Sequence, residues 1–261
     1  MPYLERDNDV RIYFEDSGGS DLPYCQARGH EILLAHGFGA ATGMWDGQVA
    51  AFSDRYRLIR WDMRGHGRTE CPEDLGHFSQ DATADDMRGI LDHLNIEKAV
   101  IGGHSLGGFM TLAFNVRYPE RVAALILQGC GPGYRSDKAR LAWNERAESR
   151  ARSLEDGGLA ALGGTGEVGA SVQGTAQGLA LAARGILSQV DARVIDSLTG
   201  ITVPTLIIIG DGDSNYLQGS DYMAARIPGA VNVLVTDATH GVNIDQPEAV
   251  NKALDEFLAG L

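Results

Sequence analysis

The chain has 261 residues, a length that commonly forms one α/β domain whose core needs no disulfide or metal for stability. With 22 Lys and Arg against 35 Asp and Glu, its net charge of −13 disfavours nucleic acid, anionic membrane surfaces and polyanionic substrates as partners. The three cysteines, Cys25, Cys71 and Cys130, lie far apart and predict neither a disulfide framework nor a zinc site. The polar N-terminus has no signal-peptide pattern and no apolar run could span a bilayer, so we expect a cytoplasmic protein.

Short apolar runs alternate along the chain with longer segments of helical pattern. The predicted strands, in chain order, are Arg11–Glu15, Glu31–Ala35, Tyr56–Trp61, Lys98–Gly102, Val122–Leu127, Thr202–Ile209 and Val231–Val235. The predicted helices among them are Gln80–Leu94, Leu106–Tyr118 and Pro247–Leu261; Ser79 caps the first and Pro119 ends the second. Strands rich in Val, Ile and Leu, separated by helices, indicate a mostly parallel sheet covered on both faces. We therefore predict an α/β fold, with Arg11–Glu15 in an antiparallel hairpin at the sheet edge.

Residues 132–200 interrupt this alternation because they contain no convincing strand. Asp137–Glu155 reads as a charged helix, Gly157–Gly178 holds eight glycines, and Ala180–Leu198 is amphipathic. A disordered linker is one interpretation. We favour a small, mobile helical lid, because the amphipathic pattern resumes after the glycines. The expected organisation is a core domain of residues 1–131 and 201–261, with a lid inserted at 132–200.

The sharpest local motif is Gly103-His104-Ser105-Leu106-Gly107-Gly108, which has the form G-x-S-x-G. It follows the predicted strand Lys98–Gly102 and opens the helix from Leu106, the context in which a strained turn lifts a serine oxygen above a sheet. Small residues two positions either side let strand and helix approach the turn. Ser105 is therefore the candidate nucleophile, and the alternative is an ordinary serine in a glycine-rich turn.

A nucleophilic serine needs a base and an acid that orients the base. Of the seven histidines, His240 follows the last predicted strand at the carboxyl end of the sheet, where Ser105 also emerges. An exposed loop histidine is the alternative interpretation. Asp211 and Asp213 follow the strand Thr202–Ile209 at the same edge, and position alone leaves either as the acid.

An oxyanion hole requires two backbone donors close to the nucleophile. Leu106 follows Ser105 at a helix N-terminus, so its N–H points toward developing negative charge. The turn His36-Gly37-Phe38-Gly39 follows the strand Glu31–Ala35, and we choose the N–H of Phe38 as the second donor. Glycines placed there only for steric reasons are the alternative.

These motifs together resemble the α/β-hydrolase family over nearly the whole chain. The matching segments are His36–Gly39, Asp62–Gly67, Gly103–Gly108, Gly210–Asp213, and His240 with Asp245–Glu248. The resemblance implies the order serine, acid, histidine, and it selects Asp213, the third residue after the glycine that ends its strand. It also implies a structural role for Asp62–Gly67. The chain departs from many relatives at Gly241-Val242-Asn243, where bulkier aromatic residues are common.

The resemblance implies a serine hydrolase with the triad Ser105, Asp213 and His240, no cofactor and no metal. Phe38, Trp45 and Phe109 on the core side, and Tyr134 and Trp143 on the lid, are the candidate substrate-binding residues. Because no arginine cluster stands beside them, we expect a small or medium neutral ester or lactone, cleaved by a monomer or homodimer. The alternatives are a carbon–carbon bond hydrolase, an enol-lactonase or a perhydrolase, and a non-catalytic ligand-binding protein on the same fold.

Overall fold

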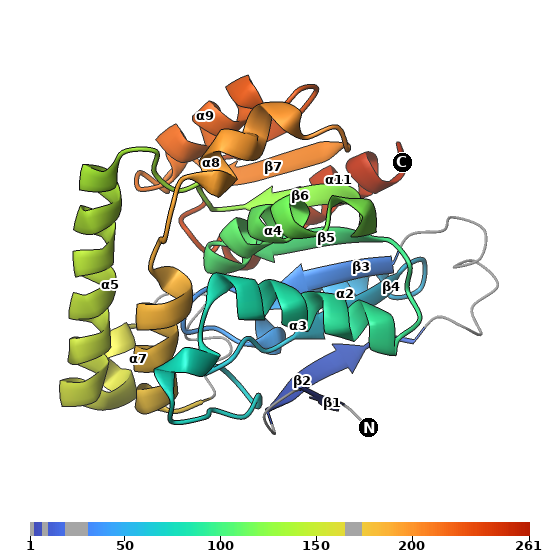
Figure 1. The fold of residues 1–261 in the computed structure, drawn as a ribbon. Helices are drawn as coiled ribbons and strands as arrows, with labels where there is room; N and C mark the ends of the chain where they lie inside the picture. Colours follow the sequence, from blue (N-terminus) through green and yellow to red (C-terminus); the bar gives the residue numbers. More distant parts are fainter. Residues whose placement is uncertain (1–2, 7–9, 19–30, 165–173) are drawn as a thin grey trace.

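The computed structural model describes residues 3–6, 10–18, 31–164 and 174–261, so Cys25 and part of the glycine-rich segment lie outside the described residues. Within these ranges eight strands form one sheet in the order β1-β2-β4-β3-β5-β6-β7-β8 (Figure 1). The strands are β1 (Tyr3–Glu5), β2 (Arg11–Asp16), β3 (Glu31–Ala35), β4 (Arg57–Trp61), β5 (Ala99–His104), β6 (Val122–Gln128), β7 (Thr205–Gly210) and β8 (Val231–Val235).

The strand pairing confirms the predicted fold class. From β4 to β8 every neighbouring pair is parallel, whereas β1 pairs with β2 and β2 with β4 in antiparallel register. All residues of β5 and β7 are buried, as expected for central strands covered on both faces. The carboxyl ends of the parallel strands therefore share one edge of the sheet.

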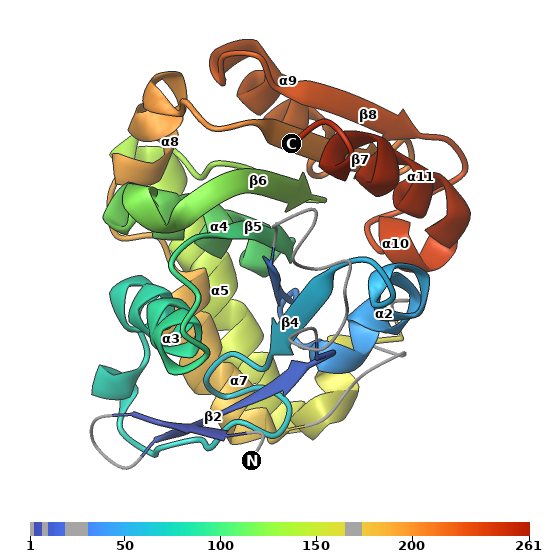
Figure 2. The same ribbon diagram turned by 90° about the vertical axis from the view of Figure 1, so that its right-hand side faces the viewer.

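Two layers of helices enclose the sheet (Figure 2). The helices are α2 (Asp46–Phe52), α3 (Gln80–His93), α4 (Leu106–Arg117), α5 (Asp137–Gly157), α7 (Ala176–Ala182), α8 (Arg193–Ser197), α9 (Leu217–Arg226), α10 (Val242–Asp245) and α11 (Pro247–Leu258). Short 3₁₀ turns lie at Thr42–Trp45, Leu75–His77, Pro119–Arg121, Gly158–Leu162 and Leu198–Gly200. One apolar core joins α3, α4 and α9 to the sheet, and a second joins α2 and α11 to its other face.

Local chemistry explains several helix boundaries. The Ser79 hydroxyl accepts a hydrogen bond from the N–H of Ala82 at 3.0 Å, so it caps α3 as predicted. Helix α4 ends at Arg117, two residues before Pro119. Helix α11 begins at Pro247, a residue suited to the first helical position because its missing N–H would have no intrahelical partner.

Helices α5 and α7 stand at the ends of the strands toward which the arrows of β3, β5 and β6 point (Figure 1). Hydrogen bonds join α5 to the segment after α7: Trp143 donates to the carbonyl of Leu187 at 2.8 Å, and Asn144 pairs with both backbone groups of Gln189. The single amphipathic segment predicted after the glycines is instead divided into α7, a π-turn at Ala183–Leu187, and α8. The division occurs at Ser188, whose backbone is extended.

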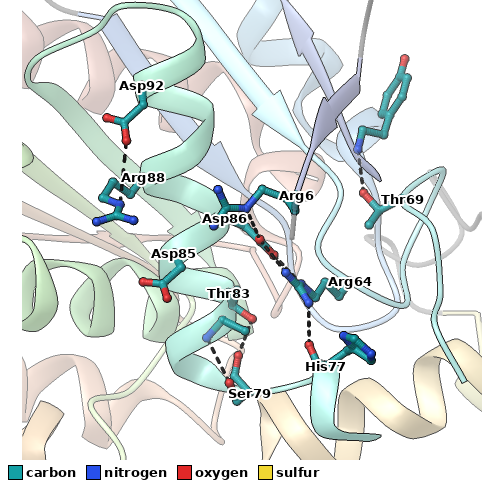
Figure 3. Close-up of polar contacts among 12 residues, drawn as sticks. Arg6, Arg64, Thr69, His77, Ser79, Thr83, Asp85, Asp86, Arg88 and Asp92 are labelled. Carbon is teal, nitrogen blue, oxygen red and sulfur yellow. Dashed lines mark hydrogen bonds and ion pairs between the residues drawn. The ribbon is translucent and has the colours of Figure 1, made fainter. Parts of the chain in front are cut away.

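A buried ion cluster fastens the first strand to the body of the molecule (Figure 3). The Arg64 guanidinium, in the turn after β4, donates to both carboxylate oxygens of Asp86 on α3 at 2.6 and 2.8 Å. Arg6, just after β1, donates to the same carboxylate at 3.1 Å, and Arg64 also donates to the carbonyl of His77. Burial raises the pKa of Asp86 while both arginines oppose the shift. The cluster thus ties three distant segments together without exposed charge on Asp86.

Among the described residues, no helix is both long and apolar enough to cross a bilayer.

Candidate active site

Ser105 occupies a strained turn between β5 and α4. Its backbone has φ 53° and ψ −114°, a conformation rarely adopted outside glycine. The flanking glycines are needed sterically: a Cβ on Gly103 would lie 2.3 Å from the Gly107 carbonyl, and one on Gly107 would lie 2.2 Å from the Ala35 oxygen. The turn is held by a 2.9 Å hydrogen bond from the Ser105 N–H to the Gln128 carbonyl. Ser105 is therefore presented at the carboxyl edge of the sheet by a close strand–helix approach.

A hydrogen-bonded chain links Ser105, His240 and Asp213. The Oγ of Ser105 lies 2.9 Å from Nε2 of His240, and Nδ1 of His240 lies 2.7 Å from Oδ2 of Asp213. Since the carboxylate accepts the proton of Nδ1, Nε2 is left as the acceptor for the serine hydroxyl. The Asp213 side chain is 2% exposed and that of His240 is 28% exposed. Asp211, the other candidate acid, is exposed and accepts from the N–H of Ala238 at 3.4 Å.

Two sets of hydrogen bonds hold the His240 loop. His104 donates from Nε2 to the His240 carbonyl at 2.7 Å, and burial lowers the pKa of His104 to about 3, so this ring is neutral. After His240, the side chain of Asn243 accepts from Gln128 at 2.8 Å and donates to the carbonyl of Met44 at 2.9 Å. The segment Gly241-Val242-Asn243 therefore anchors the loop through a buried amide network.

The turn His36–Gly39 lies directly against Ser105, the candidate nucleophile. A Cβ built on Gly37 would lie 3.3 Å from Cβ of Ser105. His36 is buried, donates from Nδ1 to the Gly37 carbonyl at 2.7 Å and accepts from the N–H of Met63 at 3.0 Å. Burial lowers the pKa of His36 to about 4, consistent with a neutral ring that braces the turn. Phe38 and Leu106, the two expected oxyanion donors, thus lie on segments that flank Ser105.

The Asp62–Gly67 turn packs behind this region. Asp62 is buried and accepts backbone hydrogen bonds from Thr42 at 2.7 Å and Arg68 at 2.9 Å, while burial raises its pKa. The ring of His66 meets that of Phe38 edge-on at 5.4 Å, and burial lowers the pKa of His66 to about 3. Because Asp62 bonds to the backbone of Thr42, a few residues after the turn His36–Gly39, the Asp62–Gly67 turn supports that neighbouring loop.

The candidate substrate-binding residues are not all placed together. Phe109 is partly buried on α4, and the rings of Tyr134 and Trp143 lie 5.9 Å apart between the segment after β6 and α5. Trp45, in contrast, is 1% exposed and packs with Ile32 and Leu34 on the sheet face covered by α2 and α11. Trp45 therefore does not join the site, because the 3₁₀ turn Thr42–Trp45 carries it into the opposite core.

Two further side chains lie here that no sequence motif marks. The ring of Tyr216 stacks on that of His240 with centroids 4.8 Å apart and planes at 14°. The Arg150 guanidinium of α5 lies 5.4 Å from the centre of the Phe38 ring. The position of Tyr216, three residues after Asp213, could have indicated that it lies near the site. Nothing in the sequence marks Arg150.

Within the described ranges, no group of three His, Cys, Asp or Glu side chains is arranged to hold a metal ion.

Comparison with known proteins agrees with this architecture. A family profile described as the alpha/beta hydrolase fold matches residues 32–153. The 3-oxoadipate enol-lactonase 1 of Acinetobacter baylyi is 29% identical over 250 residues, which cover 88% of this chain and 89% of that protein. A thermophilic esterase from Thermogutta terrifontis, solved with malate bound, is 27% identical with a TM-score of 0.84, covering 100% of this chain and 97% of that one. An enol-lactonase from Burkholderia xenovorans is 25% identical with a TM-score of 0.78, covering 99% and 100%.

Sheet topology, the turn at Ser105 and these likenesses agree that the chain has the alpha/beta hydrolase fold. It is a hydrolase.

Proposed function

We propose that the protein is a serine hydrolase that cleaves small or medium neutral carboxylic esters or lactones through an acyl-enzyme. The observation that carries the proposal is the hydrogen-bonded chain from Ser105 through His240 to Asp213. Such a chain activates a serine that would be a weak nucleophile alone. The likeness to a solved esterase supports ester bonds as the substrate class.

In the first step, Nε2 of His240 accepts the proton of Ser105 as the serine oxygen attacks the substrate carbonyl. Asp213, which is buried and bonded to Nδ1, holds the ring and stabilises the imidazolium that forms. The backbone N–H groups of Phe38 and Leu106 donate to the developing oxyanion, and each such donor is typically worth about 2.7–4 kcal/mol. The imidazolium then protonates the departing alkoxide, which leaves the acyl group on Ser105.

Deacylation repeats this sequence with water. His240 removes a proton from the water that attacks the acyl carbonyl, and it returns the proton to the Ser105 oxygen as the acid product leaves. We also infer that residues 132–200 act as the lid of the site. Helices α5 and α7 stand beyond the strand ends (Figure 1), and the Tyr134–Trp143 ring pair packs the start of this segment against α5.

A second candidate is opening of an enol-lactone ring. The 3-oxoadipate enol-lactonases 1 and 2 of Acinetobacter baylyi are 29% and 26% identical over most of this chain, and they favour this reading. The same serine, base and acid would perform both reactions, so the substrate and not the triad separates them.

The experiment measures hydrolysis of p-nitrophenyl esters of two, four, eight and twelve carbons and of simple lactones. Wild type is compared with Ser105→Ala, and Asp213→Asn is compared with Asp211→Asn. Asp211 is a matched control because it lies in the same turn, two residues away, outside the Ser105–His240 chain.

We expect Ser105→Ala to lose nearly all turnover and Asp213→Asn to lose about 10⁴-fold in kcat. Asp211→Asn should stay within about twofold of wild type, as surface substitutions usually do. Equal turnover in wild type and Ser105→Ala would show that Ser105 is not the nucleophile. Turnover of an enol-lactone added to this panel, with no turnover of the esters or simple lactones, would favour the second candidate.

A further inference from the structure

We propose that Tyr216 is a positioning residue for His240: its ring holds the imidazole in line with Ser105 and favours the protonated form that arises during proton transfer. This inference rests on the proposed function, because it gives Tyr216 a role only if His240 is the base.

The geometry of Tyr216 is set by the same turn that carries the acid. The Tyr216 N–H donates to the Asp213 carbonyl at 3.0 Å, and the N–H of Ser220 donates to the Tyr216 carbonyl at 2.9 Å. The ring is also close to the backbone after β6, since a Cβ on Gly131 would lie 3.8 Å from its Cδ1. One short segment therefore positions both the carboxylate at Nδ1 and the aromatic face against the imidazole.

The Tyr216 ring is close enough to His240 to attract a positive charge on the imidazole. With centroids 4.8 Å apart and planes at 14°, the face of the phenol ring lies parallel to the imidazole. An aromatic face within about 6 Å of a cation attracts it, most strongly where water is excluded. The attraction exists only after His240 has taken the serine proton, so it stabilises the imidazolium relative to the resting, neutral ring.

Of the other described groups around the imidazole, only Asp213 carries charge, so the contribution of the Tyr216 ring can be measured separately. Asp213 bonds to Nδ1 and also favours the charged form. The ring of His104 lies 4.7 Å away at 53°, but it is neutral because burial lowers its pKa to about 3. Cys130 and Tyr134 lie near Tyr216 on the segment after β6, and burial keeps the Cys130 thiol neutral by raising its pKa to about 12.

The phenol itself is neutral and faces the nucleophile. Burial is the main cause that raises the pKa of Tyr216 to about 12, while its interaction with the Ser105 hydroxyl acts in the opposite direction. The ring and the hydroxyl are thus separable features: Tyr216→Phe keeps the stacked ring, whereas Tyr216→Leu and Tyr216→Met remove it.

The experiment measures kcat and KM for p-nitrophenyl acetate from pH 5 to 9 in wild type and these three variants. Tyr222→Phe is the matched control, because Tyr222 lies on α9 with its ring beneath Arg226. Circular dichroism establishes that each variant is folded before kinetics are compared.

For the ring-free variants we expect the midpoint of the acidic limb of kcat/KM to fall by about 0.4–1.5 pH units, the shift equivalent to a typical cation–π attraction. Loss of alignment should also lower kcat by about tenfold or more while KM stays within about twofold. In Tyr216→Phe the midpoint of the acidic limb should stay within about 0.2 pH units of wild type, and Tyr222→Phe should match wild type. A merely structural role of Tyr216 would not produce a shift confined to the ring-free variants.

The inference is overturned if a folded ring-free variant keeps the wild-type limb and kcat, or if Tyr216→Phe moves the limb as far as Tyr216→Leu does. If Tyr216→Leu does not fold, Tyr216→Met and Tyr216→Phe decide the question by the same criteria. Failure of the proposed function is distinguishable, because activity would then survive in Ser105→Ala and His240→Ala.

Discussion

Mild acid should destabilise this protein through three buried histidines. His36, His66 and His104 are all fully buried, and burial lowers their pKa values from 6.5 to about 4, about 3 and about 3 respectively. In the unfolded chain each would titrate near its ordinary value. Folding therefore requires these rings to stay neutral at a pH where the unfolded chain binds protons.

The sign and size of the change in the free energy of unfolding with pH follow from proton linkage. Well above pH 6.5 both states hold the rings neutral, so these histidines cost nothing. As the pH falls toward 6.5 and below it, the unfolded state gains protons and the free energy of unfolding falls. At pH 5 the loss is about 2 kcal/mol for each histidine and about 6 kcal/mol for the three, against a typical total of about 5–15 kcal/mol. The loss continues until the folded-state pKa values are reached. Asp62 and Asp86, whose pKa values burial raises, act in the opposite direction only in the more acidic range of carboxyl groups.

The assay is urea unfolding, followed by circular dichroism, at half-unit steps from pH 8 to pH 5. His66→Asn keeps an amide N–H for the Arg64 carbonyl that Nδ1 now contacts at 3.1 Å, and should reduce the pH dependence by about a third. His93→Asn, at the exposed end of α3, is the control and should leave it unchanged. A free energy of unfolding that is constant from pH 7 to pH 5, or a His66→Asn profile as steep as that of wild type, would refute the reasoning.

Three further predictions concern the framework. Asp86→Ala leaves the nearly buried Arg64 without its carboxylate and should cost about 3–5 kcal/mol in urea unfolding; a loss below about 1 kcal/mol would contradict a buried pair. Gly107→Ala would place a Cβ 2.2 Å from the Ala35 oxygen and should lower ester turnover about 100-fold by displacing Ser105, whereas unchanged turnover would show that the turn can adjust. Ser105→Gly should raise stability by about 1 kcal/mol because glycine accepts φ 53° without strain; thermal unfolding beside Ser105→Ala tests this, since alanine keeps the Cβ and should show no such gain.

Seven of the eight described strands were predictable because they are short apolar runs between helices; β1 (Tyr3–Glu5) was not predicted. Glu31–Ala35 and Val231–Val235 have the predicted bounds, and β5 runs two residues further than predicted because the strand continues into the Ser105 turn. Helices α2 and α9 were not predicted. Each buries only two side chains, Gln48 and Phe52 in α2 and Ser220 and Met223 in α9, which is too few to leave a clear helical stripe in the sequence.

The site was predictable to the extent that it depends on topology. Ser105, Asp213 and His240 follow three parallel strands, and a parallel sheet brings the carboxyl ends of its strands to one edge. Their hydrogen-bonded contact agrees with that prediction, while their catalytic roles stay a proposal. The stacking of Tyr216 and the burial of Trp45 were not predictable, because ring orientation depends on how distant segments pack and not on spacing along the chain.

The connection between β6 and β7 has a consequence for how such a protein changes over time. It runs from Gln128 to Thr205 and carries α5, α7 and α8, yet it joins two strands that are direct neighbours in the sheet. The entropy of closing a loop grows only slowly with its length, so segments can be gained or lost here at little thermodynamic cost. The amide network at Asn243 holds the His240 loop separately, through the 3₁₀ turn Thr42–Trp45 and β6. If this connection forms the proposed lid, evolution can therefore exchange the lid, and with it the choice of substrate, while Ser105, Asp213 and His240 stay unchanged.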